Sequence, residues 1–193
     1  PAVSPTDIDD AAARLADLIR VTPLLDIGVG ELDLPVDVVL KLELLQHVGS
    51  FKPRGAFNRV LAAGPIPDAG LVAASGGNHG AAVAFVARSL GHRAEVFVPS
   101  SSPAMKRDRI ASLGATVHVV DGLYDDAQAA ATAHQLNTGA LAVHPYDHPD
   151  VVAGQGTMGR ELEQQMAARG SEFDTVLVAS GGGGFTAGTV AGS

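Results

Sequence analysis

Between residues 71 and 143 the chain alternates short apolar runs with longer segments of helical pattern. The apolar runs have the length of strands and cover residues 71–74, 94–98, 116–120 and 140–143. The helical segments between them cover residues 80–90, 103–113 and 125–136. Short apolar strands that alternate with helices are typical of a parallel sheet with helices on both faces, joined by right-handed crossovers. The alternation therefore predicts an α/β fold built on such a sheet.

Two irregular stretches separate this alternating region from the rest of the chain. The first runs Gly64-Pro65-Ile66-Pro67-Asp68-Ala69-Gly70, and the second runs His144-Pro145-Tyr146-Asp147-His148-Pro149. Proline and glycine at this density mark loops and linkers. We therefore expect a small inserted domain over residues 66–147, with residues 1–65 and 148–193 forming a larger domain.

The larger domain is expected to contain four helices and two strands. The helices are predicted at about residues 6–20, 53–63, 150–169 and from 185 onward, and the strands at 36–42 and 175–179. Thr6 and Asp9 have the spacing of a capping box, and Pro53 suits the first turn of a helix. Because so few elements cannot bury a parallel sheet, and the last helix is short, we expect the sequence to be C-terminally incomplete.

The overall charge restricts the classes of partner. A net charge of −8 argues against nucleic acids and anionic membranes, although a small anionic cofactor needs only a local positive field. The sequence has no cysteine, which excludes disulfides and thiolate metal sites. No segment resembles a signal peptide, and no apolar run approaches about 18 residues. We therefore expect a cytoplasmic protein without a membrane span.

The first candidate site is the segment Gly49-Ser50-Phe51-Lys52-Pro53-Arg54-Gly55. Lys52 lies just before a predicted helix, where partial desolvation and the positive end of the helix would lower the pKa of its amine. A lysine with a lowered pKa is what Schiff-base chemistry with an aldehyde requires. The alternative is a solvated lysine at the start of an ordinary surface helix.

The second candidate site, Ser75-Gly76-Gly77-Asn78-His79-Gly80, follows a predicted strand and precedes a predicted helix. Its backbone amides, together with the side chains of Ser75, Asn78 and His79, are a set of donors suited to a carboxylate. The alternatives are that Ser75 or Asn78 only caps the helix, and that His79 is a hydrogen-bonded structural histidine. The histidines and carboxylates show no metal-ligand spacing, so we expect no metal site.

Four consecutive glycines, Gly181, Gly182, Gly183 and Gly184, follow a predicted strand and precede a predicted helix. Glycine reaches positive φ values and lets backbone amides approach an anion, while the helix N-terminus adds a favourable field. A dinucleotide site would need a G-x-G-x-x-G pattern and an acidic residue about 20 positions later, for which there is no room. The run therefore favours a single phosphate, with a flexible linker as the alternative.

A lysine for an aldehyde, a loop for a phosphate and a loop for a carboxylate together describe pyridoxal 5′-phosphate acting on an amino acid. In this order the motifs resemble those of the fold-type II pyridoxal-phosphate enzymes, close to the threonine/serine dehydratases and serine racemases. The resemblance runs from Thr22 to the end of the sequence. It also includes Lys41-Leu42-Glu43, Gln46, Pro145-Tyr146-Asp147 and the segment from Val152 to Thr157.

The resemblance implies a two-lobed, tryptophan synthase β-like fold and a role for each motif residue. Lys52 would carry the cofactor as a Schiff base, and Phe51 would pack on the cofactor ring. Asn78 would hydrogen-bond the ring hydroxyl oxygen, and the loop Gly181–Gly184 would bind the phosphate. We also expect a homodimer.

The implied reaction is β-elimination from L-threonine or L-serine, which yields a 2-oxo acid and ammonia. Ser75, Asn78 and His79 would lie in the loop that receives the substrate carboxylate, and Lys52 would take the α-proton. Serine racemases place a second serine where this sequence has Gly76, so racemisation is disfavoured but is the nearest alternative. The motifs are also compatible with a β-replacement synthase and with a non-catalytic cofactor-binding fragment.

Overall fold

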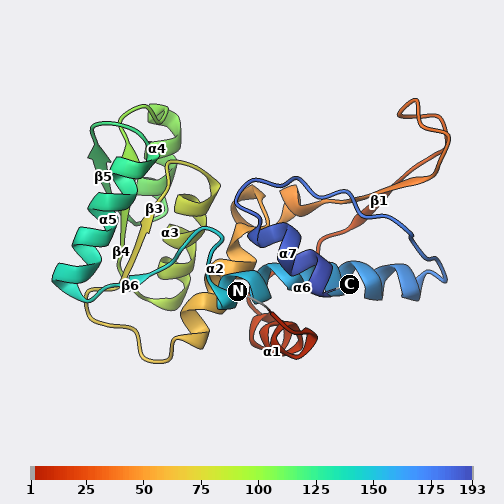
Figure 1. Cartoon of the computed structure of the whole chain (residues 1–193), viewed down its shortest axis with the longest axis horizontal. Helices are drawn as coiled ribbons and strands as arrows, with labels where there is room; N and C mark the ends of the chain where they lie inside the picture. The colour runs from red at the N-terminus through yellow and green to blue at the C-terminus, as the bar shows by residue number, and fades with distance from the viewer. Residues whose placement is uncertain (1–2, 193) are drawn as a thin grey trace.

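A four-stranded parallel sheet forms one end of the molecule in the computed structural model, which describes residues 3–192 (Figure 1). The strands are β3 (Leu71–Ala74), β4 (Ala94–Pro99), β5 (Thr116–Val120) and β6 (Leu141–Ala142), in the order β5-β4-β3-β6. Leu71 pairs with Ala94 on one side and with Leu141 on the other, and all neighbouring strands run parallel. Each strand lies within one residue of its predicted run, so the expected sheet is confirmed.

Helices cover both faces of this sheet. They are α3 (Asn78–Leu90), α4 (Ala104–Ser112) and α5 (Tyr124–Thr138). Leu71 and Ala73 of β3 belong to the apolar cluster that includes α3, whereas Val72 and Ala74 belong to the cluster that includes α5. Successive residues of a strand point to opposite faces, so a strand covered on both sides must be apolar at every position. This requirement explains why the sequence pattern identified these strands.

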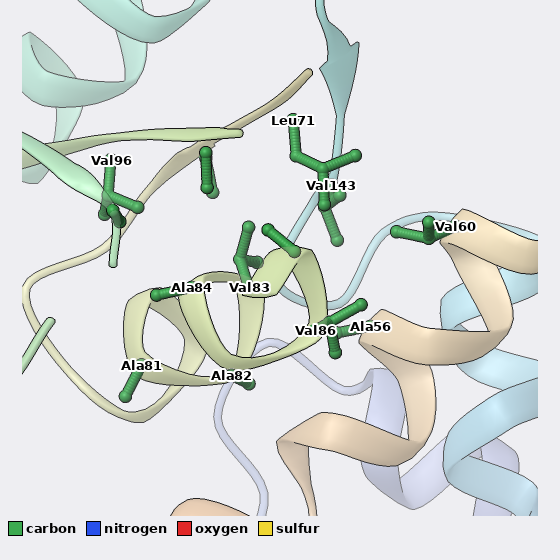
Figure 2. Close-up of a cluster of buried hydrophobic side chains, with 14 of the residues drawn as sticks. Ala56, Val60, Leu71, Ala81, Ala82, Val83, Ala84, Val86, Val96 and Val143 are labelled. Carbon is green, nitrogen blue, oxygen red and sulfur yellow. The ribbon is translucent and has the colours of Figure 1, made fainter. Parts of the chain in front are cut away.

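One buried apolar cluster also joins the sheet to helix α2 (Lys52–Ala62). Ala56 and Val60 of α2 pack in the same cluster as Val83 and Val86 of α3 (Figure 2). The predicted domain boundary at residues 65 and 66 is therefore crossed by core contacts. The division into domains over 1–65 with 148–193 and over 66–147 stays a prediction.

The other end of the molecule is built around the long helix α6 (Figure 1). The helices there are α1 (Pro5–Leu15), α6 (Pro149–Ala168) and α7 (Gly184–Gly192), together with α2. A Cβ added to Gly156 of α6 would lie 2.8 Å from the carbonyl oxygen of Gly188 in α7, so glycine is what allows these helices to pack so closely. None of the helices within residues 3–192 is both long and apolar enough to cross a membrane.

A two-stranded antiparallel hairpin extends from this helical part. Its strands are β1 (Leu24–Ile27) and β2 (Val38–Lys41), with Leu24 opposite Lys41. Two short 3₁₀ turns, Glu43–Leu45 and His47–Gly49, then lead to Lys52. The strand predicted at residues 36–42 is confirmed, whereas β1 was not predicted.

The strand predicted at residues 175–179 is wrong. This stretch has no regular secondary structure, and Leu177 is 92% exposed. A strand is held by hydrogen bonds to a neighbouring strand, and within residues 3–192 no strand pairs with this segment. The helix predicted to follow the glycines is confirmed as α7.

The capping box predicted from Thr6 and Asp9 is also wrong, because the box lies two residues earlier. The backbone amide of Ser4 donates to Asp7 Oδ2 at 2.8 Å, and the Asp7 amide donates back to Ser4 Oγ at 3.3 Å. Pro5 then takes the first helical position, where its missing N–H leaves no bond unmade. Helix α1 ends at Leu15 rather than at residue 20.

Candidate active site

The segment 143–146, which we call the strap, connects the three candidate motifs. It follows β6 at the carboxyl edge of the parallel sheet, where open α/β sheets bind their ligands. The strap contacts each of the three motifs. His79 Nε2 donates a hydrogen bond to Val143 O (2.7 Å), and Lys52 Nζ donates one to Pro145 O (2.7 Å). Tyr146 packs against Gly182 of the glycine run. The structure thus brings motifs that are far apart in the sequence to one place.

Lys52 is the first residue of α2 and its side chain is largely withdrawn from water. Burial lowers the pKa of its amine, which increases the neutral fraction needed for attack on an aldehyde. The Nζ atom lies 5.1 Å from the centroid of the Phe51 ring and donates to the strap. The alternative of a fully solvated surface lysine does not describe this side chain.

The ring of Phe51 is stacked on a second aromatic ring that the sequence analysis did not single out. Phe185, directly after the glycine run, lies with its ring centroid 3.8 Å from that of Phe51 and its plane inclined by 7°. One face of Phe51 is therefore covered by Phe185. The position of Phe185 immediately after Gly184 was the only sequence signal that could have identified it.

The glycine run forms an open loop that leads into α7. Gly183 has a φ of +84°, a conformation that glycine adopts without strain. A Cβ on Gly182 would lie 2.3 Å from Cδ1 of Tyr146, whereas a Cβ on Gly181 would meet nothing within 4 Å. In the first turn of α7, the buried hydroxyl of Thr186 has no hydrogen-bond partner among the described residues. The loop therefore offers backbone amides, a helix N-terminus and an unpaired hydroxyl to an anion.

The loop after β3 also presents backbone amides at the N-terminus of a helix. Helix α3 begins at Asn78, and its N-cap residue Gly77 makes no side-chain cap hydrogen bond. The hydroxyl of Ser75 accepts a hydrogen bond from the Gly77 amide at 3.2 Å, within the turn itself. The alternative in which Ser75 or Asn78 only caps helix α3 therefore does not describe this loop. The first backbone amides of α3 remain available to a ligand.

His79 is a buried histidine that ties this loop to the strap. Because a carbonyl oxygen only accepts, Nε2 of His79 carries the hydrogen that is donated to Val143 O. Burial lowers the pKa of His79 to about 3, so the imidazole is neutral at physiological pH. A neutral ring in this position orients the loop, which agrees with the structural role considered from the sequence.

Replacing His79 by glutamine should reduce the dependence of stability on pH. Between about pH 7 and pH 5 the unfolded chain takes up a proton on His79, whereas the folded protein does not, so acidification lowers the unfolding free energy by about 2 kcal/mol. Urea unfolding at the two pH values should show this loss in the wild type and a smaller loss in His79→Gln. The partly exposed His92→Gln is the control, and an unchanged loss in His79→Gln would contradict the assignment.

Comparison with known proteins identifies the family. The model of a family described as pyridoxal-phosphate dependent enzyme matches residues 15–193. The chain belongs to this family. A biosynthetic L-threonine dehydratase of Corynebacterium glutamicum is 40% identical over 188 residues, which cover 95% of this chain and 43% of that protein. An L-threonine ammonia-lyase of Thermotoga maritima is 37% identical over 94% of this chain and 45% of its own length.

Solved structures give the same result for the fold. A threonine deaminase from T.th. superposes with a TM-score of 0.91 at 38% identity, over 98% of this chain and 60% of that one. Maize serine racemase superposes with a TM-score of 0.92 at 30% identity, over all of this chain and 57% of that one. The fold-type II α/β architecture, with a parallel sheet and helices, is therefore established. The chain spans less than half the length of the curated relatives described above.

The residues at the strap fit the cofactor of this pyridoxal-phosphate family. The aldehyde needs an amine with a lowered pKa, which Lys52 supplies. The phosphate needs a glycine loop with free amides and hydroxyl donors, which Gly181–Gly184 and the unpaired Thr186 supply. The described residues contain no group of three or more histidine, cysteine, aspartate or glutamate side chains that could hold a metal ion.

A buried network of charges fixes the start of α2, two residues after Lys52. Arg54 is fully buried and donates to both oxygens of Glu43, at 2.7 and 2.8 Å, and to Glu161 at 2.9 Å. Glu161 also pairs with Lys41. Burial alone would lower the pKa of Arg54, but its bonds to Glu43 and Glu161 raise it above the ordinary value. The sequence motifs included Lys41, Glu43 and Arg54 without giving them a role, and Glu161 was not singled out.

Proposed function

We propose that the protein is a pyridoxal-phosphate-dependent L-threonine or L-serine dehydratase, which releases a 2-oxo acid and ammonia by β-elimination. The observation that carries the proposal is the partly buried Lys52 amine, held by the same strap that packs under the glycine loop. Relatives named threonine dehydratase and threonine ammonia-lyase support it. Their names favour threonine over serine as the substrate.

In this proposal each motif has one task. Lys52 binds the cofactor through its amine, Phe51 packs against the cofactor ring, and Asn78 hydrogen-bonds the ring hydroxyl oxygen. The loop Gly181–Gly184 binds the phosphate through its amides. When bound, the cofactor supplies an electron sink for the carbanion formed at the substrate Cα.

The remaining tasks fall to side chains of this chain. Lys52 Nζ moves the proton from the substrate Cα, for which its lowered pKa favours the neutral amine. Ser75, Asn78 and the first amides of α3 orient the substrate carboxylate. His79 stays neutral and keeps this loop against the strap through its bond to Val143.

A serine racemase is the second candidate, because maize serine racemase has the same fold with a TM-score of 0.92. Gly76 has no side chain that could return a proton to the opposite face of the substrate, which favours elimination. A β-replacement synthase is less favoured, since its reaction needs a second nucleophile.

The direct test is to identify the product formed from each L-amino acid substrate. Purified protein loaded with pyridoxal phosphate should release equal amounts of 2-oxo acid and ammonia from L-threonine or L-serine. Formation of the D-amino acid faster than the 2-oxo acid would favour the racemase. Bound cofactor without either product would indicate the non-catalytic fragment and contradict the proposal.

Two matched substitutions in the glycine loop test whether its packing against Tyr146 supports binding of the cofactor. Gly182→Ala should raise the dissociation constant of the cofactor by about tenfold or more, because the new Cβ would overlap the ring of Tyr146, 2.3 Å away. Gly181→Ala should have a smaller effect, since nothing lies within 4 Å of its Cβ position. Fluorescence titration of the apo protein measures both constants, and equal losses would contradict the role of Tyr146 as the support of the loop.

We also propose that the protein is a homodimer and that it works in the cytoplasm.

We further propose that the domain predicted over residues 66–147 moves relative to the domain predicted over residues 1–65 and 148–193. Gly64, in the first linker, has a φ of +77° with nothing near its Cβ position, which suits a hinge. Limited proteolysis should cut residues 64–70 before any strand of the sheet. Cleavage first inside the sheet would contradict the proposed division.

A further inference from the structure

A turn after β4 lies beside the loop that contains Ser75, Asn78 and His79. Strands β3 and β4 pair in parallel with Ala74 opposite Phe97, so the loops that follow them emerge at the same edge of the sheet. The amide of Ser75 donates to Phe97 O at 3.0 Å. The turn after β4 is closed by the Ser102 amide, which donates to Pro99 O at 2.9 Å.

The side chain of Ser102 fills the space in front of Gly76. A Cβ added to Gly76 would lie 2.0 Å from Ser102 Oγ and 2.8 Å from Ser102 Cβ. The missing side chain at residue 76 therefore makes room for a hydroxyl from the neighbouring turn. That hydroxyl lies against the 75–79 loop at Gly76, although Ser102 comes 26 positions after Gly76 in the chain.

The Ser102 hydroxyl is also free to bind a ligand. The side chain is only partly buried, and no residue within 3–192 forms a hydrogen bond with its Oγ. The Ser75 hydroxyl accepts a hydrogen bond from the amide of Gly77, which leaves its own O–H free to donate as well. Ser102 thus adds an O–H donor to a loop whose other donors are the uncapped amides of α3 and the side chains of Ser75 and Asn78.

We propose that Ser102 is a further substrate-binding residue, whose hydroxyl donates a hydrogen bond to the carboxylate of the amino acid substrate. The inference rests on the proposed function, because it takes the 75–79 loop as the place of the carboxylate. A hydrogen bond to a charged group in a partly desolvated loop has a large enough effect to appear in substrate affinity.

The test replaces Ser102 by alanine in the cofactor-loaded protein. L-alanine has the same amine and carboxylate but no β-hydroxyl, so calorimetric titration with it measures binding without elimination. Ser102→Ala should weaken L-alanine binding about tenfold and raise KM for L-threonine to a similar extent, while kcat and cofactor occupancy stay within about twofold. Ser101→Ala, an exposed neighbour in the same turn, should match the wild type. Unchanged L-alanine affinity in Ser102→Ala, or an equal loss of cofactor, would overturn the inference.

A double-mutant cycle with Gly76 tests whether the two residues act through one space. Gly76→Ala should displace the Ser102 hydroxyl and weaken L-alanine binding by itself. The double variant Gly76→Ala/Ser102→Gly should bind about as well as Ser102→Gly, because the same hydrogen bond is already lost and residue 102 has no Cβ left to meet the new one. If the losses of L-alanine affinity in the two single variants multiply in the double variant, the inference is overturned. If the wild type binds L-alanine but eliminates nothing from threonine or serine, the proposed function is wrong, while weaker binding by Ser102→Ala would still support the role of Ser102.

Discussion

Lys52→Ala is expected to abolish covalent attachment of the cofactor and to reduce kcat by about three orders of magnitude. The substitution removes the amine that attaches the aldehyde and that moves the α-proton, and neither function has a substitute at the strap. Borohydride reduction followed by peptide mapping should place a phosphopyridoxyl adduct on Lys52 in the wild type. The same treatment of Lys52→Ala should leave the protein unmodified.

The chain provides its own controls, because it has only three lysines, Lys41, Lys52 and Lys106. Lys106 is exposed on α4, and Lys106→Ala should keep both the adduct and the activity. The amine of Lys41 is held by Glu161 and by Thr22 O, so it is not expected to react. A specific adduct on Lys41 or Lys106, or one that persists in Lys52→Ala, would contradict the Schiff-base assignment.

Arg54→Ala is expected to lower the unfolding free energy by about 3–5 kcal/mol. The guanidinium is fully buried between Glu43 and Glu161, and its removal leaves two carboxylates facing each other without their shared cation. Urea unfolding of the cofactor-free protein at neutral pH measures the loss.

Arg107→Ala serves as the matched control for Arg54→Ala. Arg107 lies on α4, is partly exposed and has no side-chain ion pair within residues 3–192. Its replacement should change the unfolding free energy by no more than about 0.5 kcal/mol. If Arg54→Ala lowers the unfolding free energy by only about 0.5 kcal/mol, the buried network does not hold α2 on α6.

The parallel sheet could be predicted from the sequence because its strands have a strong local pattern. The segment Leu71–Ala74 is apolar at every position, and both its faces are covered in the structure. The segment at residues 175–179 is similarly apolar but forms no strand. The difference lies in the neighbours, since a strand needs hydrogen-bonding partners that its own residues do not specify.

The capping box shows a smaller limit of the same kind. Two candidate pairs with the required spacing, Ser4 with Asp7 and Thr6 with Asp9, lie within one short stretch. Pro5 decides between them, because proline suits the first position of a helix and so makes Ser4 the cap. The information was present in the sequence, but the spacing of the capping residues did not reveal it.

The sequence by itself determined the fold class, the family and the motifs of the proposed site, since these depend on residue types in a fixed local order. Only the tertiary structure decided which side chains meet. Lys52 is bound to a carbonyl oxygen 93 residues away, and His79 to one 64 residues away. Phe185 on Phe51, and Ser102 in front of Gly76, are contacts of the same kind. They follow from the register of the strands and the close packing of the helices, which local patterns do not encode.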